Sequence, residues 1–305
     1  MSDLSSMTAR GLPRRARGFH RHKQRAGLTF LLPLLLVWGL FLILPICETA
    51  YYSLMQWDGL SASWNGIGNY LHLWRSPDFG AVFINNLLLL LSVPFAVFIP
   101  FCIAIVIAME PPGWRWVRAL IFLPATLSWV VIGIVWLQVY SSDGLINQAL
   151  DALGLHRFHI DPLGSVHTAI IPIALTFIWS QVGQNTLIFL IGLSGIDASV
   201  FEAATIDGAG LIATIRQIVL PLMTRFLVFT TIITLIAAFT ALFSLIFVMT
   251  GGGPGFSTTT MEFYIYRLAF NQTDFGMGAT VGIVLLCVIA IATAPLMMLY
   301  RRTTA

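Results

Sequence analysis

Six long apolar runs, separated by polar or turn-rich segments, dominate the pattern of the chain. A helix needs about 20 residues to cross a hydrocarbon core of roughly 30 Å, and each run reaches that length. The strands of a membrane barrel would instead alternate over segments of about 10 residues, unlike these unbroken runs. The pattern therefore predicts an all-α, polytopic membrane protein. The predicted transmembrane spans are Leu28–Leu54, Ala81–Met109, Ala119–Tyr140, Thr168–Gly192, Phe226–Met249 and Gly278–Tyr300.

Several prolines lie inside the predicted spans, namely Pro94, Pro100, Pro124 and Pro172. A proline inside a helix has no N–H to donate, so each one predicts a kink that neighbouring helices support. We therefore expect an irregular bundle.

The composition agrees with a lipid environment. Hydrophobic residues make up 58% of the 305 residues and charged residues only 10%, with a mean hydropathy of +0.88. A water-soluble domain could not hide so many apolar side chains in its interior.

The positions of lysine and arginine predict the orientation, because cytoplasmic flanks are enriched in both. Seven of the 16 lie within residues 1–27, which we interpret as a basic cytoplasmic tail before a transmembrane domain of residues 28–305. With the tail inside, 13 basic residues are cytoplasmic and only Arg75, Arg157 and Arg267 are outside. Both termini are thus predicted to be cytoplasmic. The tail is interpreted as a topology signal that touches anionic lipid, and nucleic acid is not an expected partner.

Residues that could supply chemistry or energy are scarce. Glu48 is the one ionisable residue inside a predicted span, where it lines a pathway, snorkels outward or pairs locally. A Walker A loop needs Gly-Lys-Ser/Thr, but the single lysine, Lys23, follows His22. The chain is therefore not expected to be an enzyme, and any ATP hydrolysis must belong to a separate subunit.

The histidines and cysteines match no familiar metal-binding pattern. HExxH is absent, and Cys47, Cys102 and Cys287 are far apart within spans, where they are interpreted as packing residues. We expect no metal site and no cofactor in this chain.

The longest predicted cytoplasmic connection, residues 193–225, predicts a helix, a turn and a second helix. Ser199 followed by Glu202 fits a capping box, so the first helix should begin just after Ser199. Gly208 suits the left-handed turn that ends a helix, since it has no Cβ. The second helix is predicted over Leu211–Val219, closing before Pro221.

This connection resembles the EAA loop of ABC importer permeases, which has the pattern EAAxxDGA followed further on by Leu-Pro. The matching residues are Glu202, Ala203, Ala204, Asp207, Gly208, Ala209, Leu220 and Pro221. The resemblance implies a type I importer permease fold, with the loop docked on a nucleotide-binding subunit that drives transport. It also implies two ATPase subunits that bind ATP and Mg²⁺, a second homologous permease subunit and an extracytoplasmic solute-binding protein. Ile212 and Ile215 depart from the pattern, which often has Trp and Phe there, and leave the docking details open.

Other stretches resemble the sugar-type branch of these permeases, similar to those for maltose and glycerol 3-phosphate. They are residues 45–57 (PICETAYYSLMQW), Gly68–Tyr70, Gly144–Asn147 and residues 250–270 (TGGGPGFSTTTMEFYIYRLAF). The resemblance implies that the turn Gly251-Gly252-Gly253-Pro254 lies on the outer face, where a binding protein delivers substrate. The turn either contacts that protein or is a flexible lead into a re-entrant segment, and both can hold.

Polar groups inside a span must face protein or water, so they indicate a substrate pathway. Amide and aromatic side chains are typical sugar-binding groups, although amides also bond between helices. The pathway candidates are Trp179, Gln181, Gln184 and Asn185 in the fourth span, with Phe243 and Phe239 as weaker candidates in the fifth.

We therefore expect a permease subunit of an ATP-binding-cassette importer for a sugar or sugar-like solute, in the inner or plasma membrane of a prokaryote. No cation lies deep in a predicted span, which favours a neutral mono- or disaccharide over a glycerol-phosphate-type solute. One alternative is an ion-gradient-driven carrier or channel, which would transport alone and without ATP. Another is a membrane-embedded enzyme, which would need clustered acid, base or metal residues at the end of a span.

Overall fold

The structure of the protein is a computed structural model that describes residues 31–304, with side chains to Arg302. The predicted basic tail, residues 1–27, and the start of the first predicted span lie outside these residues. The chain divides into two units, Met1–Tyr51 and Tyr52–Ala305. In the first unit a helix runs from Leu31, passes through a π-helical turn, η1 (Gly39–Ile43), and continues as α2 (Leu44–Tyr52).

The second unit is helical apart from one short hairpin in which Met55 pairs with Trp64. Its elements are β1 (Met55–Trp57), β2 (Ala62–Trp64), α3 (Gly68–Arg75), α4 (Pro77–Leu90), α5 (Val93–Ala108), α6 (Trp114–Thr126), α7 (Trp129–Tyr140), α8 (Leu145–Ala152), η2 (His156–Phe158), α9 (Ile170–Ser194), α10 (Ala198–Ile206), α11 (Leu211–Thr214), η3 (Ile215–Val219), α12 (Leu220–Thr240), α13 (Phe243–Met249), α14 (Met261–Tyr266), η4 (Arg267–Asn271) and α15 (Phe275–Thr304).

Six helical stretches of the described chain are long and apolar enough to cross a membrane, which confirms the predicted polytopic helical class. They are Leu31–Tyr52, Pro77–Ala108, Trp129–Ala152, Ile170–Ser194, Leu211–Thr240 and Phe275–Arg302.

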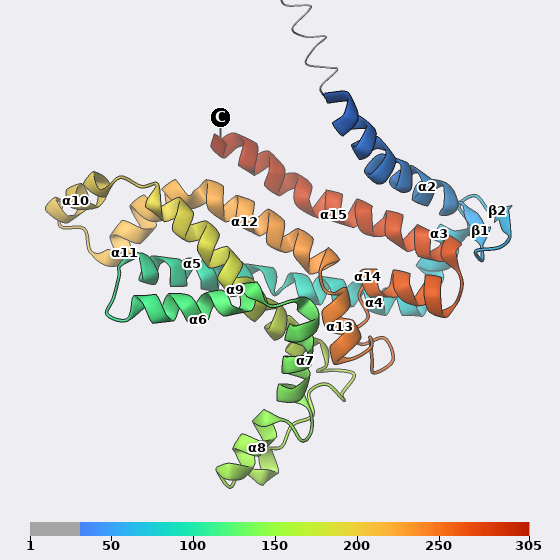
Figure 1. Ribbon diagram of the computed structural model, residues 1–305, viewed down its shortest axis with the longest axis horizontal. Coiled ribbons are helices and arrows are strands. Elements are labelled where there is room, and N and C mark those ends of the chain that lie inside the picture. The colour runs from blue at the N-terminus through green and yellow to red at the C-terminus, as the bar shows by residue number, and fades with distance from the viewer. Residues whose placement is uncertain (1–30, 305) are drawn as a thin grey trace, which may run out of the picture. The chain divides into compact units, whose positions relative to one another are not determined.

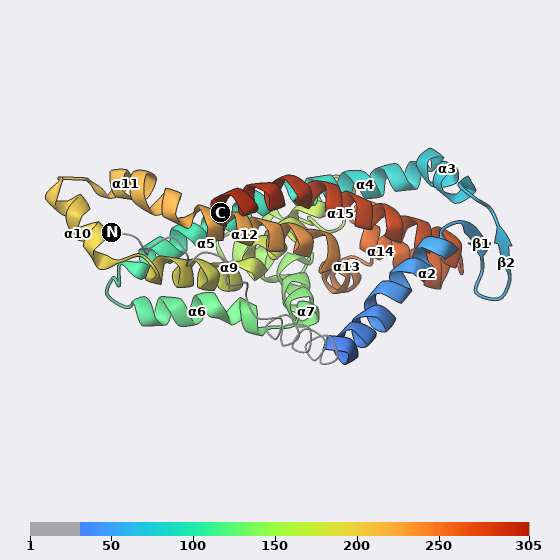
Figure 2. The ribbon, with the colours of Figure 1, turned by 90° about the horizontal axis from the view of Figure 1, so that it is seen from above.

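Helices α5, α9 and α12 form the centre of the second unit (Figures 1 and 2). α5 packs along α9, and α12 contacts both of them. Phe101 of α5 and Phe189 of α9 are buried and meet edge to face, with ring centroids 5.3 Å apart. The outer helices α6 and α15 then pack along α9 and α12, respectively. This helical core connects the loop that carries α10 and α11 with the segment around the turn Gly251–Pro254.

The predicted end of the second loop helix before Pro221 was wrong. The helix continues from Leu211 through η3 into α12, so the fifth apolar stretch begins well before the predicted Phe226. In η3 the Leu220 amide donates to Ile215 O, five residues back. A π-turn is wider than an α-helical turn, which gives room to a proline ring that has no N–H to donate.

Two further predicted spans are interrupted. The third, Ala119–Tyr140, breaks between α6 and α7, where Ser128 accepts a hydrogen bond from the Val131 amide and caps α7. The fifth ends at Thr240 instead of Met249, and α13 is a separate short helix. A side chain caps the helix that follows each break, Ser128 at α7 and Glu262 at α13, and such groups compete with the helix ladder. Apolar content alone did not predict these breaks.

Candidate functional site

The loop helix α10 begins one turn after α9 ends, and its cap differs from the prediction. Asp197, not Ser199, caps the helix, with Oδ1 of Asp197 accepting from the Ser199 amide at 2.9 Å. This hydrogen bond lowers the pKa of the Asp197 carboxyl. The predicted start after Ser199 was therefore too late, because the upstream aspartate supplies the capping oxygen.

Gly208 ends α10 as predicted, with φ at +72°. The Gly208 amide donates to Thr205 O at 3.1 Å, and the Ala209 amide donates to Ala204 O at 2.9 Å. This pair of bonds is the Schellman arrangement, which satisfies the last carbonyls of a helix. A Cβ at Gly208 would meet nothing within 4 Å, so only the backbone conformation selects glycine.

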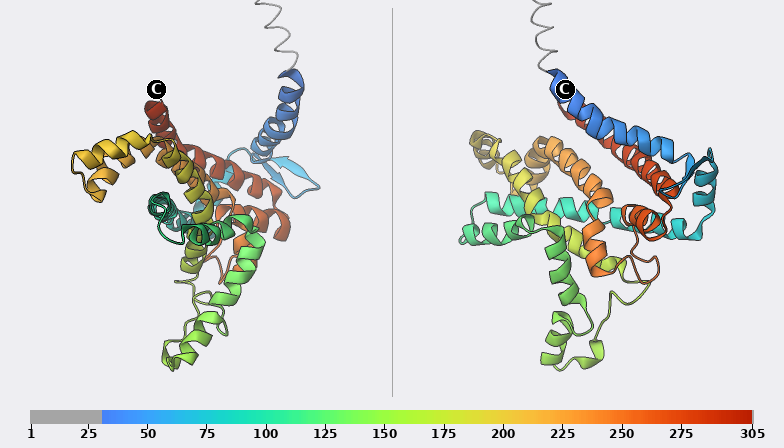
Figure 3. Two further views of the ribbon diagram at one scale, coloured as in Figure 1. Left: turned by 60° about the vertical axis from the view of Figure 1, so that its left-hand side comes forward. Right: turned by 45° about the vertical axis from the view of Figure 1, so that its right-hand side comes forward.

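The loop presents one packed face and one exposed face. Ala204 is buried, and Phe201 packs against the hydrophobic core of the unit. On the other face Ile206 is 85% exposed and Ile212 is 81% exposed. Figures 1 and 3 show α10 and α11 beyond the ends of α9 and α12. The remaining matched positions are Glu202, Ala203, Asp207, Leu220 and Pro221, which are exposed, and Ala209, which is half-buried.

The turn Gly251–Pro254, far from α10 along the core, is tightly bonded. The hydroxyl of Thr258 donates to Gly253 O at 2.9 Å, and that of Thr259 donates to Gly252 O at 2.8 Å. Gly252 has φ at +86°, and a Cβ there would lie 2.7 Å from the Phe263 ring. Gly251, also at positive φ, is exposed and has open space.

Two asparagines of α4 anchor the segment that follows this turn. Nδ2 of Asn85 donates to Phe256 O at 2.7 Å and to Thr259 O at 3.0 Å. Oδ1 of Asn86 accepts from the Met261 amide at 2.8 Å. The sequence reasoning missed both residues, although adjacent amides inside an apolar span were a signal that their side chains must face protein.

Arg267 closes the same loop from the other side. Its Nη1 donates to Gly255 O at 3.1 Å, and its guanidinium carbon lies 4.2 Å from the centroid of the Phe256 ring. Hydrogen bonds from Thr258 and Thr259 therefore hold the turn, and Asn85, Asn86 and Arg267 hold the segment that follows it.

Glu262, outside the six candidate spans, caps the separate helix α13. Its Oε2 accepts from the Phe243 amide at 3.0 Å. Burial raises the pKa of the Glu262 carboxyl to about 7, against the lowering effect of this hydrogen bond. The Phe243 ring lies 5.6 Å from that of Phe263 and 5.2 Å from that of Tyr266. The pathway candidate Phe243 is thus part of an aromatic cluster, and Phe239 is fully buried.

The pathway candidates of α9 face different surroundings. Asn185 is fully buried, and its Nδ2 donates to Ala96 O at 2.8 Å and to Thr234 Oγ1 at 3.0 Å, joining α9 to α5 and α12. Gln181 is buried, whereas Gln184 is exposed. Trp179 is half-buried and meets Trp136 edge to face, with ring centroids 5.4 Å apart. The geometry gives Asn185 an interhelical role and leaves Gln184 as the accessible amide of the set.

Residues 28–304 match the family of binding-protein-dependent transport system inner membrane components. The chain belongs to this family. This permease is 32% identical over 270 residues to a probable ABC transporter permease of Pyrococcus horikoshii, covering 87% of this chain and 92% of that one. It is 30% identical over 271 residues to the lactose transport system permease of Rhizobium radiobacter, covering 87% and 90%. It is also 30% identical over 262 residues to the sn-glycerol-3-phosphate transport system permease of Yersinia pestis, covering 85% and 88%.

Solved structures share the fold of this permease. A chain of a bacterial ABC transporter involved in the import of the acidic polysaccharide alginate superposes with a TM-score of 0.81 at 22% identity, covering 95% of this chain and all of that one. A chain of the MetNI methionine ABC transporter superposes with a TM-score of 0.54 at 16% identity, covering 74% of this chain and 95% of that one. These similarities confirm the importer permease fold that the EAA resemblance implied.

Proposed function

We propose that this permease moves a sugar or sugar-like solute, delivered by an extracytoplasmic binding protein, at the expense of ATP hydrolysed by separate subunits. Two relatives belong to transport systems for lactose and for sn-glycerol-3-phosphate, which supports this substrate class. The chain carries no Walker A sequence, so nucleotide and Mg²⁺ belong to partner ATPase subunits.

The exposed face of α10 and α11 is the observation that carries the coupling role. Ile206 and Ile212 are apolar and exposed, and no described residue covers them. Large exposed apolar side chains beside Glu202 and Asp207 are typical of a docking surface for another protein. A nucleotide-binding subunit is the proposed partner.

The helix that follows the loop supplies a mechanical connection. Residues Leu211–Thr240 form one helical stretch, so a displacement of α11 moves α12 directly. The Asn185–Thr234 hydrogen bond then ties α12 to α9 in the middle of the core. Closure of an ATPase dimer on the loop would therefore shift the packed helices together.

The end of the second unit that carries α10 and α11 is proposed to face the cytoplasm. Arg118 lines one cavity together with Phe201 of α10 and Leu211 of α11, and Arg301 and Arg302 end α15. This accumulation of arginine follows the rule for cytoplasmic flanks. The turn Gly251–Pro254 then faces outward, as a proposed contact for the binding protein. The proposed complex contains two permeases and two ATPase subunits.

Charge at the outer side favours a neutral solute. Arg267 is engaged by Gly255 O and the Phe256 ring, and so is not free to meet a phosphate. Arg75 and Arg157 are exposed and are the cations that a glycerol-phosphate-type solute could use. A neutral mono- or disaccharide is therefore the first candidate, and a glycerol-phosphate-type solute is the second.

Reconstitution of the purified complex in liposomes tests this function. We expect uptake of a labelled sugar that requires ATP, the ATPase subunits and the binding protein together. Mass spectrometry of the ligand on the co-purifying binding protein would identify the solute. Uptake by this chain alone, without ATP, would overturn the proposal in favour of an ion-gradient-driven carrier.

A further inference from the structure

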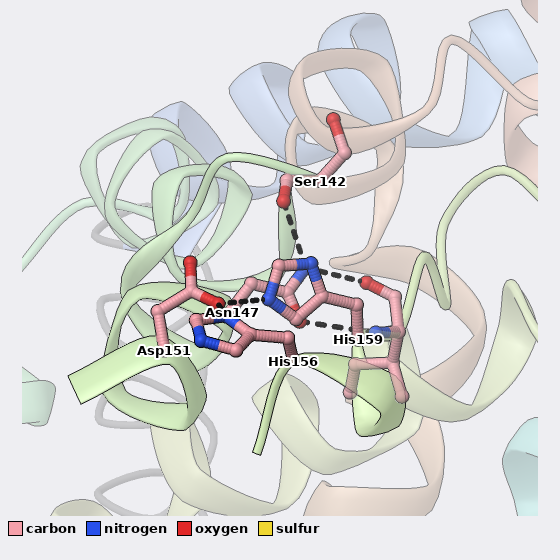
Figure 4. A network of polar contacts seen from close by, with 6 residues as sticks. Ser142, Asn147, Asp151, His156 and His159 are labelled. Atoms are coloured by element: carbon pink, nitrogen blue, oxygen red, sulfur yellow. Dashed lines mark hydrogen bonds and ion pairs between the residues drawn. The ribbon is translucent and has the colours of Figure 1, made fainter. Parts of the chain in front are cut away.

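Asp151, His156 and His159 bring three potential metal-ligand atoms together beside α8 (Figure 4). Nδ1 of His156 and Nε2 of His159 each lie 2.5 Å from the same carboxylate oxygen, Oδ1 of Asp151. All three ligand atoms lie within 4.8 Å of one another. The side chains of Asp151, His156 and His159 are 42%, 70% and 44% exposed, so an ion from solvent can reach them.

The end of α8 turns the chain back so that the histidines meet the aspartate. Gly154 has φ at +74°, and the Leu155 amide donates to Leu150 O at 2.8 Å. The short helix η2 then carries His156, with His159 directly after it. A 3₁₀ helix has about three residues per turn, so these two histidines lie on the same side.

A buried asparagine holds the other edge of the cluster. Asn147 lies one helical turn before Asp151 and is 3% exposed. Its Nδ2 donates to Ser142 O at 2.8 Å and to Ile160 O at 2.7 Å, and its Oδ1 accepts from the Ile160 amide at 3.0 Å. Because Ile160 follows His159, these bonds fix the backbone of that ligand relative to α8. Such support is what orients the ligands of a metal site.

Two imidazole nitrogens and one carboxylate oxygen form a donor set that suits Zn²⁺, with expected metal–nitrogen distances of about 2.0 to 2.1 Å. We propose that Asp151, His156 and His159 bind a first-row divalent metal ion, foremost Zn²⁺, with a fourth position open to water. The ion would replace the contact in which both imidazoles share one oxygen. The spacing Asp-x4-His-x2-His differs from HExxH, so the sequence pattern did not predict it.

The bound ion would join η2 to α8 through its ligands and hold residues 142–160 as one rigid element. Figures 1 and 3 show α8 far from α10 in the same unit, so the site is separate from the coupling loop. Arg157 lies between the two histidines in sequence, and its guanidinium carbon lies 5.8 Å from the centroid of the Phe158 ring.

Titration of ZnCl₂ into the purified full chain in detergent, without a histidine tag, tests the site. The test variant is His156→Ala/His159→Ala. The matched control is His20→Ala/His22→Ala, which removes two histidines from the tail. Calorimetry should show one Zn²⁺ per chain, with affinity lowered by at least about 100-fold in the test variant and unchanged in the control. Asp151→Asn, which preserves side-chain volume, should lower affinity by about 10- to 100-fold.

A second measurement uses Co²⁺ as a spectroscopic probe. We expect visible absorption bands of a tetrahedral site in the wild-type chain and in the control, and their loss in both cluster variants. Unchanged Zn²⁺ affinity in both cluster variants, or loss of binding only in the tail variant, would overturn the proposal. Either result would leave the proposed transport function intact, because the coupling loop does not depend on this cluster.

Discussion

The loop of α10 and α11 and the turn Gly251–Pro254 both contain glycine at positive φ, but they are held differently. The first is fixed by bonds between near neighbours, such as Ala209 N to Ala204 O. The second also has bonds between near neighbours, from the hydroxyls of Thr258 and Thr259 to Gly253 O and Gly252 O, but the segment that follows it is anchored by asparagines 171 to 175 residues away in sequence. The first leaves one face exposed, whereas the second has its interior filled. A loop held by near neighbours can move together with its helix. A loop held by contacts from distant parts of the chain depends on the packing of the whole second unit.

The largest effect on stability is expected from Gly252→Ala. An alanine at this position must adopt the left-handed backbone conformation of Gly252, which lowers the free energy of unfolding by about 1–2 kcal/mol. It also places a Cβ against Phe263 and Thr259, for which overpacking costs about 1–3 kcal/mol more. The melting temperature of the purified chain in detergent should fall clearly. Gly251→Ala is the control, since it changes only the backbone term, and an equal loss in both variants would contradict the packing argument.

Asn85→Ala should have the next largest effect. It removes the donor to two loop carbonyls, of which only Thr259 O is in a buried bond, and one buried group left unsatisfied costs about 1–3 kcal/mol. The melting temperature and the protease resistance of residues 250–261 should both fall. Gln184→Ala, at an exposed amide of α9, should leave both unchanged. If this loop were flexible, Asn85→Ala would leave the melting temperature and the protease resistance unchanged.

The half-buried carboxyl of Glu262 should make stability depend on pH. Its pKa is raised from 4.5 to about 7, so the folded state holds the proton more tightly than the unfolded state. The stabilising contribution is complete below about pH 4.5 and is lost as the pH rises to about 7, with no further change above that value. Melting temperatures measured from pH 5 to pH 8 should fall in the wild type and vary less in Glu262→Gln. An identical pH profile in the two proteins would exclude this residue as the cause.

Gly208→Ala should cost stability only through its backbone, about 1–2 kcal/mol, because a Cβ meets no atom there. Its effect on function should be larger, since the turn sets the angle between α10 and α11. In the reconstituted complex we expect ATP hydrolysis to continue while uptake falls, and Gly208→Asp should show the same uncoupling more strongly. Normal uptake per ATP in both variants would remove Gly208 from the coupling element.

The smallest effect on stability is expected from Ile206→Ser/Ile212→Ser. Both side chains are exposed in this chain, so the free energy of unfolding should change by less than about 0.5 kcal/mol. Their proposed role is in docking, and co-purification of the ATPase subunits should therefore weaken. Leu153→Ser, at an exposed leucine beside α8, is the matched control and should leave ATPase recovery unchanged.

The sequence was sufficient where structure depends on neighbouring residues or on composition. The six apolar stretches and the turn at Gly208 follow from span length and from the absence of a Cβ. It was insufficient where distant groups decide the outcome. Asn85 and Asn86 acquire their role only when α4 lies beside the outer loop, and Glu262 caps α13 across a turn of the chain.

Competition between local signals caused the remaining errors. Asp197 and Ser199 are both good caps, and the choice between them depends on the path of the chain out of α9. Proline usually ends a helix, but the π-turn before Pro221 lets the helix continue. The interhelical role of Asn185 could be stated as one of two alternatives from sequence, and only the positions of Ala96 and Thr234 favour it.

The most direct test of the central claim is cross-linking from the exposed face of α10. Ala203→Cys would be made in a chain whose three cysteines, Cys47, Cys102 and Cys287, are replaced by serine. In membranes that contain the full complex, we predict an adduct between this cysteine and a nucleotide-binding subunit, with a yield that changes on addition of ATP. Labelling of the same cysteine by a membrane-impermeant maleimide added from outside the cell, with no adduct to an ATPase subunit, would contradict the account.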